Sequence, residues 1–178
     1  AGLPEDVLEA AREAAGKDEQ PGWKLTLQAP SYIPVMQYAD NRALREALYR
    51  ASVTRASELG PEKLDNSPLI GRILALRQEA AALLGFANHA EVSLVPKMAE
   101  SPEQVLGFLE DLARRALPFA KRDWAELTEF ARTELGLEQV EAWDVAWVSE
   151  KLRVKRYAFS DNEVKQYFPE PKVLAGMF

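Results

Sequence analysis

Apolar residues recur three and four positions apart along most of this 178-residue chain. This spacing places them on one face of an α-helix, so it predicts a mainly α protein. One stretch departs from the pattern, because Trp23, Leu25 and Leu27 alternate with polar residues, as in a half-buried strand. We therefore expect a multi-helix, bundle-like fold with one or two short β-strands near residues 23–28.

Prolines, glycines and capping residues mark the expected helix ends. They predict helices over residues 4–15, 41–59, 67–84, 102–135 and 143–156, and a last helix that begins near Lys172. Pro118 lies inside one of these helices and predicts either a kink or a division into two helices. Residues 30–39 are ambiguous, because Ser31 could cap a short helix or the segment could be extended.

Two further patterns refine these helices. Capping-box spacing occurs at Ser101 with Gln104 and at Ser160 with Glu163. The helix over residues 67–84 has a broad apolar face that we expect to be buried. Its members are Ile70, Ile73, Leu74, Leu76, Leu83 and Leu84.

We find no linker, repeat or low-complexity tract, so we expect one helical unit over residues 1–178. The chain begins without methionine and ends on LAGMF in the middle of an apolar pattern. We expect both ends to be cuts through a larger protein. Such a cut leaves apolar surface uncovered, and we expect self-association around Val173, Leu174, Met177 and Phe178.

Composition excludes several classes of function. The net charge of −6 and the pI near 5.0 argue against binding to nucleic acid. No apolar run approaches the ~20 residues that span a membrane. The chain has no cysteine, which excludes a thiolate nucleophile and is compatible with the cytoplasm, where we expect the protein. The basic run KLRVKR, residues 151–156, is interpreted as a solvated helix face rather than an anion site.

The only histidine, His89, limits the metal sites that the chain can form. A zinc hydrolase site on a helix needs two histidines four residues apart, and the His-x-Glu start of a zinc deaminase site needs two later cysteines. A di-iron Glu-x-x-His motif fails because Phe86 replaces the glutamate. Asn88 and Glu91 are instead spaced nearly as a capping box, so we interpret His89 as an early helix residue at the surface.

Other catalytic patterns are also missing. The sequence has no Gly-x-Ser-x-Gly elbow and no phosphate-binding glycine loop. Glu126 and Glu129 share a helical face, but such pairs mostly face solvent. Trp143 and Trp147 are four residues apart, which favours packing. We therefore expect no catalytic, cofactor-binding or metal-binding residue within residues 1–178.

Several stretches nevertheless resemble one family over nearly the whole chain and in order. They are residues 23–57 (WKLTLQAPSYIPVMQYADNRALREALYRASVTRAS), residues 65–112 (beginning DNSPLIGRILALRQEAAALLGFANHAEVSLVPKMA), residues 143–169 (beginning WDVAWVSEKLRVKRYAF) and KVLAGMF. The chain resembles the oligopeptidase A branch of the thimet-oligopeptidase-like zinc metallopeptidases. LLGFANHAEVSLVPKMA and WDVAWVSEK are the most specific parts. His89 stands where relatives commonly have an aromatic residue, and Trp147 where tyrosine is usual.

The resemblance implies a largely helical, two-lobed peptidase with a deep channel for short peptides. Its catalytic zinc would lie on a His-Glu-x-x-His helix, whose glutamate acts as general base on a zinc-bound water. None of those residues maps onto residues 1–178, so we expect this segment to supply scaffold helices and part of the channel wall, without zinc or activity by itself. The predicted strand could offer its edge to a peptide. The alternative is a helical interaction module without chemistry.

Overall fold

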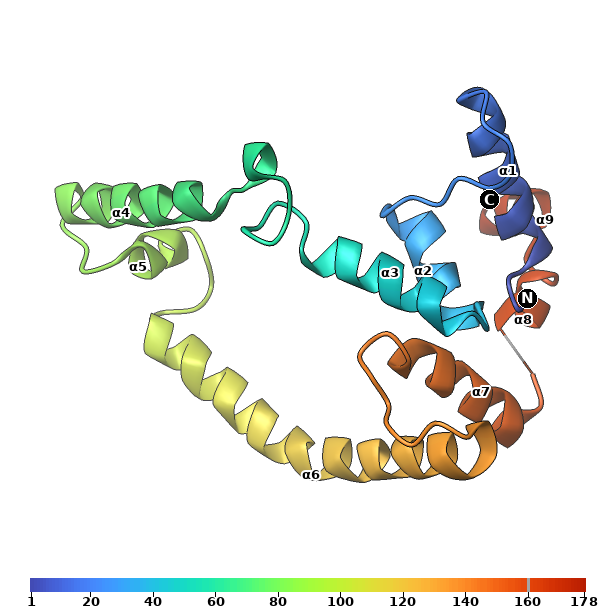
Figure 1. Ribbon diagram of the computed structural model, residues 1–178. Coiled ribbons are helices and arrows are strands. Elements are labelled where there is room, and N and C mark those ends of the chain that lie inside the picture. The colour runs from blue at the N-terminus through green and yellow to red at the C-terminus, as the bar shows by residue number, and fades with distance from the viewer. Residues whose placement is uncertain (160) are drawn as a thin grey trace. The chain divides into compact units, whose positions relative to one another are not determined.

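The computed structural model describes residues 1–159 and 161–178, without the side chains of residues 161 and 162. Helices follow one another along the chain (Figure 1). They are α1 (Glu5–Lys17), α2 (Ala29–Tyr38), α3 (Arg42–Val53), the 3₁₀-helix η1 (Glu62–Leu64), α4 (Ser67–Leu83), α5 (His89–Leu94), α6 (Pro102–Leu135), α7 (Val145–Tyr157), α8 (Asp161–Lys165) and α9 (Glu170–Met177). The expectation of a mainly α fold is confirmed.

The chain forms two compact units. Unit 1 comprises residues 1–53 and 125–178, and unit 2 comprises residues 54–124. Helix α6 contributes its first part to unit 2 and its last part to unit 1. The expectation of one helical unit over residues 1–178 stays a prediction.

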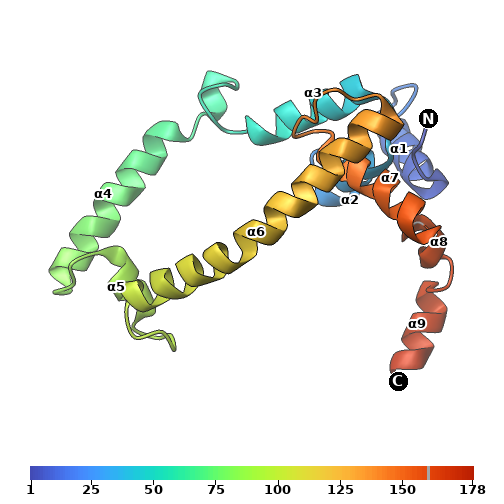
Figure 2. The ribbon, with the colours of Figure 1, turned by 90° about the horizontal axis from the view of Figure 1, so that it is seen from below.

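Unit 1 has a core between the C-terminal part of α6 and α7, which lie side by side in Figure 2. Leu127 and Ala131 of α6 are buried against Val148 of α7. Helix α2 packs against α7 and also contacts α1 and α3, and it buries Val35 and Met36. Burial of this kind stabilises by about 1.5–3 kcal/mol per large apolar side chain, so α2 and α7 hold the unit together.

The predicted strand near residues 23–28 is wrong, since none of the described residues lies in a strand. The segment has no neighbouring strand to pair with. Its backbone amides bond elsewhere: Lys24 N–H donates to the carbonyl of Ala11 in α1 at 2.9 Å, and Thr26 N–H donates to Ser31 Oγ at 2.9 Å. The segment is an irregular connection in which Leu25 and Leu27 are half-buried and Trp23 is 58% exposed. Without a strand edge, the hypothesis of peptide pairing there loses its basis.

The ambiguous residues 30–39 form α2, which begins at Ala29 and contains Pro34. Ser31 does not cap it, because its hydroxyl accepts from Thr26 instead. Helix α6 runs unbroken through Pro118, so the alternative of two separate helices is wrong. The expected box at Ser101 is confirmed, since Gln104 N–H donates to Ser101 Oγ at 3.2 Å. The box that would begin at Ser160 lies outside the described residues.

Helix α3 ends at Val53, six residues before its predicted end. Beyond it, Ser57 Oγ donates to the carbonyl of Thr54 at 2.8 Å, and Ala56 has a positive φ of 56°. A hydroxyl that bonds to a nearby carbonyl competes with the helical hydrogen bonds. The turn therefore forms where the apolar spacing alone predicts a continuing helix.

In unit 2, α4 ends as the sequence predicts. Gly85 has a φ of 82°, Gly85 N–H donates to the carbonyl of Ala82 at 3.1 Å, and Phe86 N–H donates to that of Ala81 at 2.9 Å. This pair of bonds is a Schellman motif, which requires a left-handed residue and so favours glycine. The following α5 then packs against α4.

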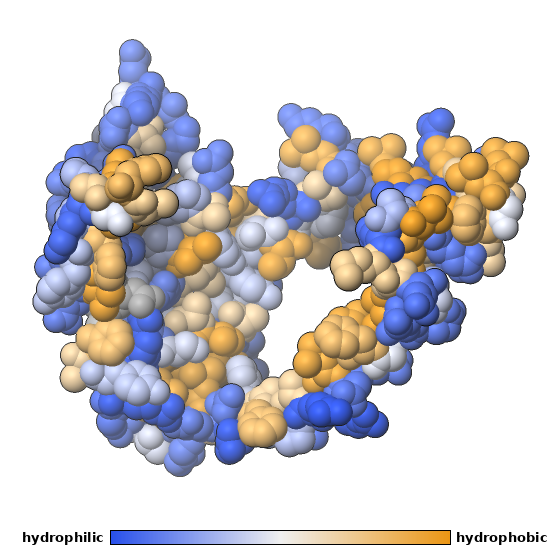
Figure 3. All heavy atoms as spheres, turned by 180° about the vertical axis from the view of Figure 1, so that it is seen from behind, coloured by the Kyte–Doolittle hydropathy of each residue, from blue (hydrophilic) through white to orange (hydrophobic). Residues whose placement is uncertain are grey.

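The expected burial of the apolar face of α4 is wrong for the described structure. Ile70, Ile73 and Leu74 are about half exposed, and Leu83 is 83% exposed. Figure 3 shows these hydrophobic residues, in orange, at the surface of α4 at the right of the view. The first part of α6 is similar, because Phe108 and Leu112 are also exposed. The large apolar side chains of α4 and of the first part of α6 thus stay largely exposed, although α5 packs against α4.

Candidate functional site

The charged group most deeply buried in unit 1 is Asp144, at the N-terminus of α7. Its carboxylate accepts from Arg42 Nη2 and from Arg45 Nη2, each at 2.7 Å. Both arginines lie on the first turn of α3. Arg45 is as buried as Asp144, whereas the Arg42 side chain is 44% exposed. One carboxylate thus joins α7 to a helix about a hundred residues earlier in the chain.

Burial tends to raise the pKa of Asp144, because it disfavours the charged form. Hydrogen bonds from Arg42, Arg45 and the Glu141 backbone N–H act in the opposite sense and outweigh it, so the net pKa lies below the ordinary value. The same bond raises the pKa of Arg42, although burial opposes that shift. Asp144 is therefore held as a carboxylate whose lone pairs are occupied, which suits a structural ion pair rather than a proton-transfer group.

All three guanidinium nitrogens of Arg45 donate hydrogen bonds, Nη2 to Asp144 and the other two to backbone carbonyls. Its Nη1 donates to the Ala39 carbonyl at 2.6 Å and its Nε donates to the Trp143 carbonyl at 3.1 Å. Its guanidinium also lies 4.5 Å from the centre of the Trp147 ring. A planar, multidentate cation is well suited to such a position, and lysine could not replace it.

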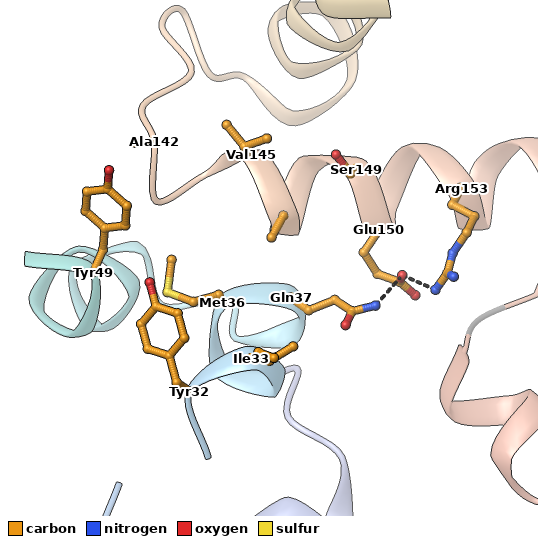
Figure 4. Close-up of a pocket in the computed structure, with 11 residues that line it drawn as sticks. Tyr32, Ile33, Met36, Gln37, Tyr49, Ala142, Val145, Ser149, Glu150 and Arg153 are labelled. Carbon is orange, nitrogen blue, oxygen red and sulfur yellow. Dashed lines mark hydrogen bonds and ion pairs between the residues drawn. The ribbon is translucent and has the colours of Figure 1, made fainter. Parts of the chain in front are cut away.

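A pocket of about 480 Å³ lies beside this ion pair, between α2, α3 and α7 (Figure 4). Its apolar wall includes Ile33, Met36 and Val145. Tyr32 and Tyr49 stand at one side, and Gln37 reaches toward Glu150 at the other. The volume is within the usual range for small-ligand sites, and mixed walls of this kind are typical of them.

Glu150 is 6% exposed and, with Arg153, is one of two charged residues among those that line the pocket. Its Oε2 accepts from Gln37 Nε2 at 3.0 Å and also bonds to Arg153. Its Oε1 is buried and has no hydrogen-bond partner in the described structure. The pocket therefore combines apolar walls with one unsatisfied acceptor.

His89 is exposed and is the first residue of α5. Asn88 Oδ1 accepts from Glu91 N–H at 3.1 Å, and Glu91 Oε2 accepts from Ala87 N–H at 3.0 Å. The carboxylate nearest in sequence is thus committed to capping, which confirms the interpretation of His89 as an early helix residue. Among the described residues, no group of three or more His, Cys, Asp or Glu side chains is arranged to hold a metal.

The basic run of α7 is paired with carboxylates. Lys151 Nζ lies 3.2 Å from Asp40, Lys155 Nζ lies 2.6 Å from Glu134, and Arg156 bonds to Glu126. These pairs attach α7 to α6 and to the segment after α2. The interpretation of this run as a solvated face is only partly right, because the face is a set of salt bridges within unit 1. An anion would have to compete with these carboxylates.

Two other sequence features are structural. Glu126 and Glu129 bond to different arginines, Arg156 and Arg132, so they do not act as a pair. Trp143 lies 6.0 Å from Tyr49, ring to ring, and Trp147 Nε1 donates to Asp40 at 3.3 Å. Both tryptophans pack in unit 1, as expected.

Sequence analysis did not single out Asp144, Glu150, Arg42 or Arg45. A signal for them was present, because the most specific motif, WDVAWVSEK, contains both acids, and ADNRALR contains both arginines. An acid in an otherwise apolar run indicates a buried, paired charge.

None of the helices within the described residues is long and apolar enough to cross a membrane.

Comparison with known proteins gives consistent matches. A model described as "Peptidase family M3" matches residues 35–178. "Oligopeptidase A" of Salmonella typhimurium is 53% identical over 180 residues, covering 100% of this chain and 26% of that protein. "Probable cytosolic oligopeptidase A" of Arabidopsis thaliana is 44% identical over 97% of this chain and 24% of its own length. "Dipeptidyl carboxypeptidase" of Salmonella typhimurium is 31% identical over 100% of this chain and 26% of its own length. The chain spans about a quarter of the length of these relatives.

Proposed function

This chain belongs to peptidase family M3, and we propose that it is a segment of a zinc metallo-oligopeptidase that hydrolyses internal peptide bonds of short peptides. The resemblance stated from the sequence is confirmed by the family match and by the oligopeptidase A relatives. The observation that carries the proposal is the 53% sequence identity, along the whole chain, to the relative named "Oligopeptidase A". We propose peptide substrates and zinc for the whole protein and not for residues 1–178 alone.

The residues of this chain do not fit a zinc site. The lone His89 is exposed, and Glu91 is occupied by Ala87 and Asn88. A catalytic zinc needs about three protein ligands and an open position for water. We therefore assign the metal and the peptide-cleaving groups to polypeptide other than residues 1–178.

The role proposed for this segment is that of scaffold helices and part of the channel wall. Unit 1 supports it with the α6–α7 core and the buried ion pair of Asp144. Unit 2 supports it differently, because its helices expose many large apolar side chains, among them Ile70, Leu83 and Phe108. Those side chains would pack against the rest of the peptidase.

The test compares the full peptidase chain with residues 1–178 alone. Both are incubated with an internally quenched fluorescent peptide of about ten residues, and bound zinc is measured by elemental analysis. We expect cleavage and about one zinc per molecule for the full chain, and neither for residues 1–178. Stoichiometric zinc on residues 1–178 would overturn the assignment of the metal to other polypeptide.

The alternative, a helical interaction module without chemistry, is favoured by one observation. The apolar face of α4 would also suit a protein partner. A full chain that binds no zinc and cleaves no peptide would support this alternative.

Two further proposals concern state and location. Met177 is 70% exposed at the end of α9, with Leu174 and Phe178 also exposed, so we expect residues 1–178 to self-associate through this surface. Sedimentation of wild type against a Leu174→Ser, Met177→Ser double variant tests this, and a monomeric wild type would contradict it.

We also propose a cytoplasmic location, supported by the Arabidopsis relative whose name includes "cytosolic", and tested by cell fractionation.

A further inference from the structure

The pocket between α2, α3 and α7 holds several polar groups that unit 1 leaves unused. The hydroxyls of Tyr32, Tyr49 and Ser149 line it and make no hydrogen bond with the described residues. Glu150 lines it too, and its Oε1 is buried without a donor. These groups come from three helices and line one cavity (Figure 4).

The unsatisfied oxygen of Glu150 is the most informative of these groups. Most buried polar atoms in proteins have a hydrogen-bond partner, and a buried acceptor without one destabilises the fold. The carboxylate itself is held in place, because its other oxygen is bonded to Gln37 and Arg153. A ligand that donates one hydrogen bond to Oε1 would remove that cost.

The remaining walls determine what kind of ligand fits. Ile33, Met36 and Val145 offer an apolar surface large enough for an aromatic or branched side chain. The ion pair of Glu150 with Arg153 leaves the polar end formally neutral, so neither a cation nor an anion is attracted strongly. The hydroxyls of Tyr32 and Ser149 can donate to a carbonyl. A neutral group that has both an N–H and a C=O meets these requirements.

We propose that this pocket binds a neutral secondary amide that carries an apolar side chain, with its N–H donating to Glu150 Oε1 and its apolar group against Ile33, Met36 and Val145. Oε1 is sealed from water in the structure without ligand, so binding requires a local shift of the pocket lining around it. A capped amino acid, a small free amide and one unit of a peptide all share this chemistry. The inference does not depend on the proposed peptidase activity.

The test uses matched probes with the full chain. N-benzylacetamide has the required N–H, benzyl acetate has nearly the same shape without it, and benzylammonium adds a positive charge. Binding is measured by saturation-transfer NMR titration. We expect a dissociation constant on the order of 1 mM for N-benzylacetamide, from the affinity usual for a ligand of this size. Benzyl acetate should bind about 10-fold more weakly, because it leaves Oε1 without a donor.

Variants locate the site. Ser149→Phe fills the pocket from an exposed position and should abolish binding, whereas Ala125→Phe, an equally exposed change on α6, should not affect it. Glu150→Gln should reduce the preference for N-benzylacetamide over benzyl acetate by about 5-fold. Circular dichroism of each variant tests whether it is folded. If Glu150→Gln does not fold, the Ser149→Phe variant provides the decisive result.

Each outcome decides the question. Binding of N-benzylacetamide that is unchanged in a folded Ser149→Phe variant would overturn the site, and so would equal binding of all three probes. No binding at 20-fold above the expected constant would also overturn it. Acetyl-Ala-Ala-Phe-Ala-Ala-amide distinguishes the two kinds of ligand that could supply the amide. Tighter binding than N-benzylacetamide supports a peptide as the ligand, and similar binding supports a small free amide. Loss of zinc from the full chain tests the peptidase separately and should leave this binding unchanged.

Discussion

Both parts of α6 carry leucines, but in different surroundings. In unit 1, Leu127 is 7% exposed and packs near Val148 of α7. In unit 2, Leu112 is 54% exposed. The comparison teaches that amphipathic spacing specifies a helix with an apolar face, while burial of that face depends on which other elements reach it.

The charged groups of the two units differ in the same way. Asp144 of unit 1 has a fully buried side chain that bonds two arginines from α3. Asp111 of unit 2 bonds Arg114 and Arg115 of its own helix, whose side chains are each 77% exposed. A buried pair strongly penalises the loss of one partner, whereas exposed pairs within a helix contribute little.

The largest effect is expected when Asp144 is removed. Asp144→Ala leaves the buried guanidinium of Arg45 without its anion, and we expect a loss of about 3–5 kcal/mol in the free energy of unfolding. The matched change Asp111→Ala should cost less than about 1 kcal/mol. Urea unfolding followed by circular dichroism measures both. Similar losses in the two variants would erase the distinction between the units.

Two leucine truncations on the same helix are expected to differ almost as much. Leu127→Ala leaves a cavity in unit 1 and should lower the free energy of unfolding by about 2–5 kcal/mol. Leu112→Ala removes an exposed side chain and should change it by about 0.5 kcal/mol or less in residues 1–178. If Leu112→Ala is costly only in the full peptidase, its face is covered there.

Acid should weaken unit 1 through Asp144. Its pKa is lower when folded than when unfolded, so its stabilising effect is fully present above the unfolded value of about 4 and is lost as the pH falls through the folded value. We expect the stability difference between wild type and Asp144→Asn to shrink below about pH 4. Urea unfolding between pH 7 and pH 2.5 measures it. A difference independent of pH would contradict the assignment.

The smallest effects concern two helix ends with positive φ. Gly85→Ala in unit 2 should cost about 1 kcal/mol, because its φ is 82° and no neighbouring atom would meet the new Cβ. Ala158 in unit 1 has a φ of 57°, so Ala158→Gly should stabilise by up to about 1 kcal/mol. Thermal unfolding gives both signs. Two changes of the same sign would show that neighbouring contacts outweigh backbone conformation.

Local features of the fold could be predicted from the sequence. Capping by Asn88 and Ser101, the glycine end of α4 and the helical face of α7 all depend on residues a few positions apart. The segment near Trp23 was mispredicted because a strand requires a partner that no local pattern reveals. The end of α3 was missed because the hydroxyl of Ser57 competes with the helix.

The candidate site depended on contacts between distant residues, which is why residue patterns did not locate it. Glu150 is bonded by Gln37, 113 positions earlier. Arg45 and Asp144 are 99 positions apart. The family resemblance identified peptidase family M3 because it compares whole motifs. The same motifs contain these residues but do not show what they contact.

The pairing of Arg45 with Asp144 has a consequence for how the protein is made on the ribosome. Helix α3 emerges early, but its anion is translated 99 residues later, after all of unit 2. At about 5–20 residues per second, the guanidinium stays in water for at least several seconds before unit 1 can close. Helices α4 and α5 of unit 2 are neighbours in sequence and in contact, so their packing does not have to wait for Asp144.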